Sequence, residues 1–220
     1  MQQKKFDFSL YLVTDRTLSH PRDIVDIVRL AIEGGVTAVQ VREKNIPTRE
    51  FIEICLKIKS LLFEKKIPLI VNDRVDVALA VDADGVHLGQ NDMPSNVARA
   101  ILGKKKIIGL SVENLEQAIY ADKNYDVDYL GVSPIFSTLT KTDLEGSWGI
   151  EGLKELRKQT NKKLIGIGGI TKENAQSVIE AGADGIAVVS AICAAENPKQ
   201  AALELRNIID KFYDKTYCSW

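Results

Sequence analysis

Two aspartates stand at the ends of apolar runs that are typical of buried strands. Asp73 directly follows the run at 68–72, and Asp92 closes the stretch that begins with the strand-like residues 85–88. Carboxylates from the ends of successive parallel strands can hold Mg²⁺, which usually keeps some waters and binds substrate phosphate oxygens. The same aspartates could instead cap the helices that follow them. These two positions alone leave Mg²⁺-assisted diphosphate chemistry and helix capping equally open.

Strand-like runs alternate with helical patterns along the whole chain, which predicts a βα repeat and a parallel sheet. Phe51, Ile54, Cys55 and Ile58, for example, recur at the spacing of one buried helical stripe. We expect eight strands, at 10–14, 38–42, 69–72, 85–88, 107–111, 129–132, 164–167 and 185–189.

A short sequence motif also recurs before three of these strands. It reads VDADGV at 81–86, VDYL at 127–130 and AGADGI at 181–186. Units of roughly 20 to 35 residues suit a βα module. We therefore predict the α/β class, with one (βα)₈ TIM barrel domain over 1–220 and a loose C-terminal tail at 214–220. The alternative is a doubly wound open sheet, but its GxGxxG signature is missing from the first βα turn.

Composition narrows the function classes. The 220 residues are 45% hydrophobic and 27% charged, with a formal net charge of -1. This balance gives no general attraction to nucleic acid or to an anionic membrane, and no apolar run is long enough to span a bilayer. Residues 1–6 lack the apolar core of a signal peptide, so we expect a cytoplasmic location. The three cysteines and two histidines show no zinc-ligand spacing, and His87 is interpreted as a hydrogen-bonded core residue.

The late part of the chain offers a phosphate site. In a barrel, phosphate often binds between the loops after strands seven and eight. Gly168 and Gly169 would let backbone N–H groups approach an anion, and Thr171 is expected to cap a helix at 172–181. Val189 and Ser190 follow the last strand beside them. Tight packing of strand against helix is the alternative reading, and we favour phosphate.

Other strand ends add positive charge and hydrogen-bond donors. Arg42 and Lys44 flank Glu43 after the second strand, where the guanidinium can grip a diphosphate and the ammonium can act as a point charge. An internal salt bridge with Glu43 is the alternative. Ser111 ends the fifth strand, where it could also be a helix cap. The long loop after the sixth strand carries Thr138, Thr140 and Lys141, whose hydroxyls and ammonium are suited to phosphate binding. A solvated surface loop is the alternative, and we favour phosphate binding.

The ordered set of motifs resembles the thiamine phosphate synthase family. The resemblance covers approximately residues 10–198 and is carried by the segments 40–44, 71–76, 87–94, 138–141, 166–171 and 188–192. It implies condensation of hydroxymethylpyrimidine diphosphate with hydroxyethylthiazole phosphate, giving thiamine phosphate and diphosphate.

The same resemblance implies a role for each candidate residue. Asp73 and Asp92 would hold Mg²⁺ as the cofactor. The pyrimidine diphosphate would contact Gln40, Arg42, Lys44, Asn72, Ser111 and Lys141, among which Arg42, Asn72 and Lys141 are the expected catalytic residues. The thiazole phosphate would contact Thr138 and Thr140, with Gly169, Val189 and Ser190 completing the phosphate-binding end. The loop 137–147 would close over the reacting groups and exclude water.

Two alternatives remain at this level. Some relatives are thiazole tautomerases, which would have a histidine two residues after Ser111, where this chain has Glu113. A noncatalytic sensor of thiazole phosphate is the other alternative. Retention of Asp73 and Asp92 with Arg42 and Lys141 disfavours both, because a mere binder has no need for a metal and diphosphate site. A homo-oligomer formed through the outer helices stays open.

Overall fold

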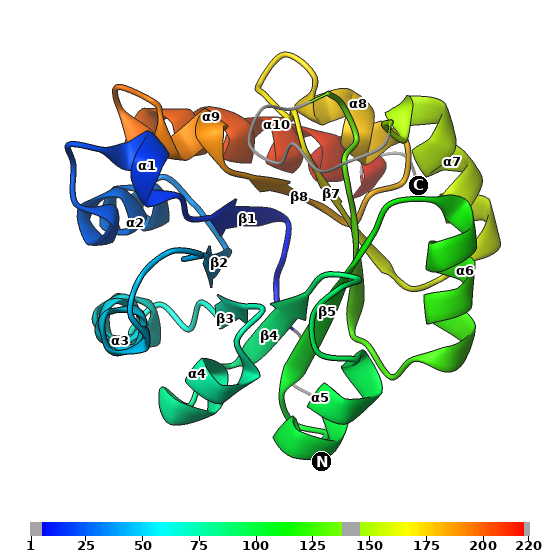
Figure 1. Cartoon of the computed structure of the whole chain (residues 1–220). Helices are drawn as coiled ribbons and strands as arrows, with labels where there is room; N and C mark the ends of the chain where they lie inside the picture. Colours follow the sequence, from blue (N-terminus) through cyan, green and yellow to red (C-terminus); the bar gives the residue numbers. More distant parts are fainter. Residues whose placement is uncertain (1–5, 138–145, 218–220) are drawn as a thin grey trace.

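Eight parallel strands close into a barrel in the order of the sequence, with β1 beside β8 (Figure 1). The computed structural model describes residues 6–137 and 146–217. The strands are β1 (Leu10–Val13), β2 (Ala38–Val41), β3 (Leu69–Asn72), β4 (Gly85–Leu88), β5 (Ile107–Val112), β6 (Tyr129–Val132), β7 (Lys163–Ile167) and β8 (Gly185–Val188). The predicted fold class is therefore confirmed, and every predicted strand end lies within one residue of the observed end.

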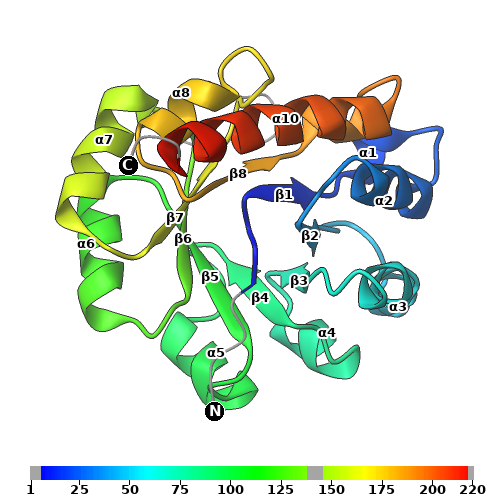
Figure 2. The same ribbon diagram turned by 180° about the vertical axis from the view of Figure 1, so that it is seen from behind.

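Helices cover the outside of this barrel. They are α1 (Arg16–Ser19), α2 (Ile24–Glu33), α3 (Thr48–Phe63), α4 (Val75–Ala80), α5 (Ser95–Leu102), α6 (Leu115–Asn124), α7 (Gly149–Gln159), α8 (Ala175–Glu180), α9 (Ser190–Cys193) and α10 (Pro198–Tyr217). The long α10 packs beside α2 and α8 (Figure 2). It carries the chain through residues 214–217, where we expected a loose tail, while 218–220 lie outside the described residues. Within the described ranges, no helix has the length and apolar character needed to cross a membrane.

Alternation along each strand divides the apolar residues into two layers, because successive strand side chains point to opposite faces. One set packs outward against the helices, as Leu10, Leu12 and Val39 do. The other fills the barrel interior with a cluster that includes Tyr11, Ile70 and Tyr129. Phe8, which precedes β1, belongs to this inner cluster.

The repeated sequence motif ties neighbouring strands together at their N-terminal ends. In each repeat an aspartate carboxylate accepts a backbone N–H from the adjacent strand: Asp84 from Leu69 at 3.0 Å, Asp128 from Ile108 at 2.8 Å and Asp184 from Leu164 at 2.8 Å. Arg99 pairs with Asp128 at 2.7 Å, and Arg157 pairs with Asp184 at 2.9 Å. These contacts lie at the end of the barrel opposite to the C-terminal strand ends, so the motif stabilises the sheet.

Candidate active site

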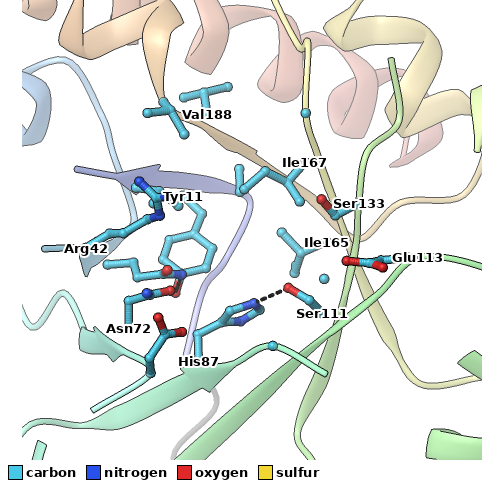
Figure 3. A pocket seen from close by; sticks show the side chains of 18 of the residues that line it. Tyr11, Arg42, Asn72, His87, Ser111, Glu113, Ser133, Ile165, Ile167 and Val188 are labelled. Atoms are coloured by element: carbon cyan, nitrogen blue, oxygen red, sulfur yellow. Dashed lines mark hydrogen bonds between the residues drawn. The ribbon is translucent and has the colours of Figure 1, made fainter. Parts of the chain in front are cut away.

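A pocket of about 250 Å³ opens at the C-terminal ends of the strands. Residues in or just after all eight strands line it (Figure 3). Arg42 and Asn72 lie on one side of it, and Ile165 and Ile167 form an apolar part of the lining on the other. The barrel thus brings together polar groups that are far apart in the sequence, from Tyr11 to Ser190.

The pocket contains every described residue among the site candidates. These are Gln40, Arg42, Lys44, Asn72, Asp73, Asp92, Ser111, Gly169, Val189 and Ser190. The other three candidates, Thr138, Thr140 and Lys141, lie outside the described residues, as does most of the expected closing loop.

The two aspartates form a carboxylate pair on one side of the pocket. Asp73 adopts the left-handed backbone conformation, with φ of 60°, directly after β3, and its N–H donates to the carbonyl of His87 at 2.8 Å. Asp92 is held by the backbone N–H of Gly89, which donates to Oδ2 at 2.6 Å. Burial, and then the hydrogen-bonding contact with Asp92, raises the pKa of Asp73 to about 6. The two carboxyl groups therefore contact each other, and neither aspartate caps a helix, because the N-cap residues of α4 and α5 are Arg74 and Pro94.

Positive charge stands beside this pair. Lys44 and Arg42 line the same pocket and act against the rise in the Asp73 pKa. Asp15 lies 3.6 Å from the Arg42 guanidinium and also caps α1, because its side chain accepts the N–H of Thr17 and of Leu18. The Arg42 side chain is thus held from the β1–α1 connection.

Glu43 does not form the internal salt bridge with Arg42 that was the alternative. Its ion-pair partner is Arg16, at a distance of 4.0 Å, and its side chain is only 6% exposed. Its Oε1 atom is buried and has no hydrogen-bond partner among the described residues. Burial raises the pKa of Glu43 to about 7. The carboxylate that orients Arg42 is consequently Asp15.

The glycine pair after β7 packs tightly against the loop after β6. Gly168 and Gly169 have φ of 101° and 65°, and an added Cβ on Gly169 would lie 2.8 Å from the Cβ of Phe136. Both readings of the pair are thus compatible with the structure, because the turn that packs so closely also lines the pocket.

The expected helix at 172–181 begins later than predicted. The Asn174 side chain accepts from Thr171 N–H at 2.8 Å and donates to the carbonyl of Gly169 at 2.9 Å. This bridge closes a tight loop, so α8 starts at Ala175 and Thr171 is not its cap. The helix that begins at the pocket is the short α9, whose first residue is Ser190.

The floor of the pocket contains residues that the sequence analysis did not select. Tyr11, His87 and Tyr129 line it and are 1%, 9% and 1% exposed. His87 is hydrogen-bonded and buried as interpreted, but it also faces the pocket. The alternation of side chains along β4 could have revealed this. Leu88 points outward, so the preceding residue, His87, points into the barrel with Gly85.

Comparisons with known proteins agree with this geometry. The family model described as thiamine monophosphate synthase matches residues 10–192. The chain belongs to the thiamine monophosphate synthase family. It is 54% identical to a thiamine-phosphate synthase of Albidiferax ferrireducens over 201 residues, which cover 91% of each protein. It is 50% identical to a thiamine-phosphate synthase of Syntrophomonas wolfei over 93% of this chain and 98% of the relative.

A solved structure extends the likeness to the fold. Thiamine phosphate pyrophosphorylase from Pyrococcus furiosus superposes with a TM-score of 0.85 at 45% identity, covering 93% of this chain and 96% of that one. In this member of the thiamine monophosphate synthase family, the matched region 10–192 contains all the described pocket residues and the whole barrel.

Proposed function

We propose that this protein is a thiamine phosphate synthase, a transferase that joins hydroxymethylpyrimidine diphosphate to hydroxyethylthiazole phosphate. The observation that carries the proposal is the meeting of Asp73 and Asp92 with Arg42 and Lys44 in one pocket, in a chain of this family. Such a set of charges suits a diphosphate and its counter-cation, and a tautomerase or a sensor has no need of it.

The carboxylate pair fits Mg²⁺ as the cofactor. Asp73 and Asp92 would supply hard oxygen ligands. Burial, and then the contact with Asp92, raises the pKa of Asp73, and a bound cation would favour the charged form of both carboxylates. Within the described ranges no group of three or more acidic, histidine or cysteine side chains forms a complete metal cage. Mg²⁺ would take its other ligands from water and from the diphosphate, and it would neutralise charge on that leaving group.

The remaining residues bind and orient the reactants. Arg42 and Lys44 are suited to grip the diphosphate, and Asn72 offers an amide beside them. The reaction forms a bond between the thiazole nitrogen and the pyrimidine methylene carbon and breaks the bond from that carbon to the diphosphate oxygen. The nitrogen attacks through its lone pair, so no general base is needed. Lys141 completes the proposed catalytic set with Arg42 and Asn72.

The opposite side of the pocket is the proposed thiazole phosphate end. Gly169, Val189 and Ser190 lie there, where the loop after β7 meets the start of α9. Thr138 and Thr140 are proposed to contact the same phosphate. Residues 1–220 are proposed to form one catalytic domain that acts in the cytoplasm on small-molecule substrates.

The test is to incubate the purified protein with both substrates and to measure thiamine phosphate and diphosphate. We expect one diphosphate for each thiamine phosphate with Mg²⁺ present, and neither product when Mg²⁺ is chelated. Binding of thiazole phosphate without either product would favour the sensor. Isomerisation of a thiazole carboxylate phosphate in place of condensation would favour the tautomerase.

A further inference from the structure

A chain of hydrogen bonds crosses the pocket floor and joins two of the proposed pyrimidine-binding residues. Gln40 Nε2 donates to the Tyr11 hydroxyl at 2.9 Å, and the Tyr11 and Tyr129 hydroxyls are 3.1 Å apart. Tyr129 lies 2.9 Å from His87 Nδ1, and His87 Nε2 lies 2.9 Å from Ser111 Oγ. Figure 3 shows the last of these contacts, with the imidazole pointing at the serine. We call these five residues the floor chain.

The barrel leaves room for the floor chain at two glycines. Gly109 pairs with Tyr129 in the sheet, and a Cβ on Gly109 would collide with the Tyr129 ring. A Cβ on Gly131 would lie 2.9 Å from His87 Cε1. Phe8 packs beneath the two tyrosines, with ring centroids 5.3 and 5.0 Å away. The aromatic members are therefore fixed by packing.

The protons of the floor chain have few possible arrangements. Burial raises the pKa of both Tyr11 and Tyr129 above the usual range, so each phenol keeps its proton and donates one hydrogen bond. A neutral imidazole carries one N–H and one acceptor nitrogen. With His87 neutral and each phenol donating its proton within the floor chain, the four hydrogen bonds between Gln40 and Ser111 all form only if every donor points the same way along the chain.

Two such arrangements exist, and they present opposite groups to the pocket. When Gln40 donates to Tyr11, as in the structure, its Oε1 remains as an acceptor for a ligand. The donors then run on to Ser111, which accepts from His87 and keeps its own proton for a ligand. When the Gln40 amide turns over, the direction of every hydrogen bond in the chain reverses. Gln40 then offers an N–H to the ligand, and the Ser111 hydroxyl donates its hydrogen bond to His87 instead of to the ligand.

We propose that Tyr11, Tyr129 and His87 are positioning residues that couple the Gln40 amide to the Ser111 hydroxyl and so select an aminopyrimidine. This inference rests on the proposed function. An aminopyrimidine offers an amine donor and ring-nitrogen acceptors, which match an acceptor at Gln40 and a donor at Ser111. An oxo group in place of the amine needs a donor at Gln40, and the coupled chain then removes the donor at Ser111. Coupling therefore penalises the oxo ring at one end or the other.

The test compares binding of amino- and oxo-pyrimidine diphosphates by calorimetry, with Mg²⁺ and without the thiazole substrate. Because nothing is turned over, the ratio of dissociation constants reports recognition alone. In Tyr129→Phe the two ends can turn independently, so we expect the preference for the amino compound to fall about tenfold, the value of one hydrogen bond. Tyr11→Phe interrupts the floor chain at a second place and should lower the same ratio. It replaces Tyr129→Phe in the test if that variant fails to fold.

Two controls separate coupling from packing. Phe8→Leu disturbs the same aromatic cluster without removing a hydrogen bond, and Tyr125→Phe removes a hydroxyl outside the floor chain. Both should keep the wild-type ratio even if stability falls. A merely structural role would weaken both ligands equally, so an unchanged ratio in the two floor-chain variants would overturn the inference. If the wild-type protein binds neither pyrimidine and forms no product, the proposed function is overturned instead.

Discussion

At the scale of single residues, the site depends on backbone that holds carboxylates in place. Asp73 is in the left-handed region, which is unusual for a residue other than glycine but more accessible to aspartate than to most residues. Such strain costs of order 1–3 kcal/mol and often lies at functional sites. The sequence shows that Asp73 follows a strand, but it does not show this φ, because the contact between Asp73 N–H and His87 that fixes it joins two strands.

Gly89 is the residue whose change should act on the carboxylate pair with little effect on the fold. A Cβ at this position would lie 2.8 Å from Asp92 Oδ2, which the Gly89 N–H now holds. For Gly89→Ala we expect the Mg²⁺ concentration for half-maximal activity to rise about tenfold, since a hydrogen bond to a charged group is weakened. Gly152→Ala in α7 is the matched control, because its Cβ would make only ordinary contacts. Equal activation curves for both variants would contradict this role of Gly89.

Glu43 should make stability depend on pH. Folding raises its pKa to about 7 from an ordinary 4.5, because the folded protein favours the neutral carboxyl. The folded state therefore has its full stability below pH 4.5, and the free energy of unfolding falls as the pH rises through 7. Glu43→Gln removes this loss. We expect the variant to gain roughly 2–3 kcal/mol relative to wild type between pH 4.5 and pH 8, measured by urea unfolding.

The control for this comparison is Glu53→Gln on the exposed face of α3. It removes the same charge at a solvated position, so its unfolding free energy should follow the wild type at every pH. If Glu43→Gln also follows the wild type between these pH values, burial of the Glu43 carboxyl does not raise its pKa as described.

At the scale of elements, periodicity predicted strands better than it predicted helix starts. Strand ends were correct within one residue because a buried strand between two polar turns has a clear length. The predicted start of α8 was wrong because the Asn174 side chain folds back to Gly169 and Thr171. Several residue types after a glycine pair could make such a bridge, so the residue types alone do not reveal it. His87 was undervalued for a related reason, since its partners lie on β5 and β6.

The aspartate of the repeated motif should act on stability alone. Asp128 accepts from Ile108 N–H and from Arg99, at the barrel end far from the pocket. We expect Asp128→Ala to lower the free energy of unfolding by about 2 kcal/mol, because a partly buried N–H and a guanidinium lose their acceptor. The KM values of the folded protein should stay unchanged. Asp126→Ala, which removes the exposed second partner of Arg99, should cost less than about 0.5 kcal/mol.

At the scale of the whole molecule, the two ends of the barrel have different tasks. The N-terminal strand ends carry the aspartate contacts and the buried Phe8, whereas the C-terminal ends carry the pocket. This division explains what the sequence could predict. Residues that lie at strand ends, such as Arg42 and Asp73, are recognisable one at a time, but the floor chain exists only when five strands close around it.

Asp73 and Asp92 are proposed to hold the cation on which diphosphate release depends. The most direct test measures thiamine phosphate formation by wild type and by Asp92→Ala over a range of Mg²⁺ concentrations, with circular dichroism to confirm the fold of both. We predict that Asp92→Ala keeps the fold and loses about 10²-fold or more in turnover at every Mg²⁺ concentration. Folded Asp92→Ala protein with wild-type, Mg²⁺-dependent turnover would show that Asp92 does not hold the cation.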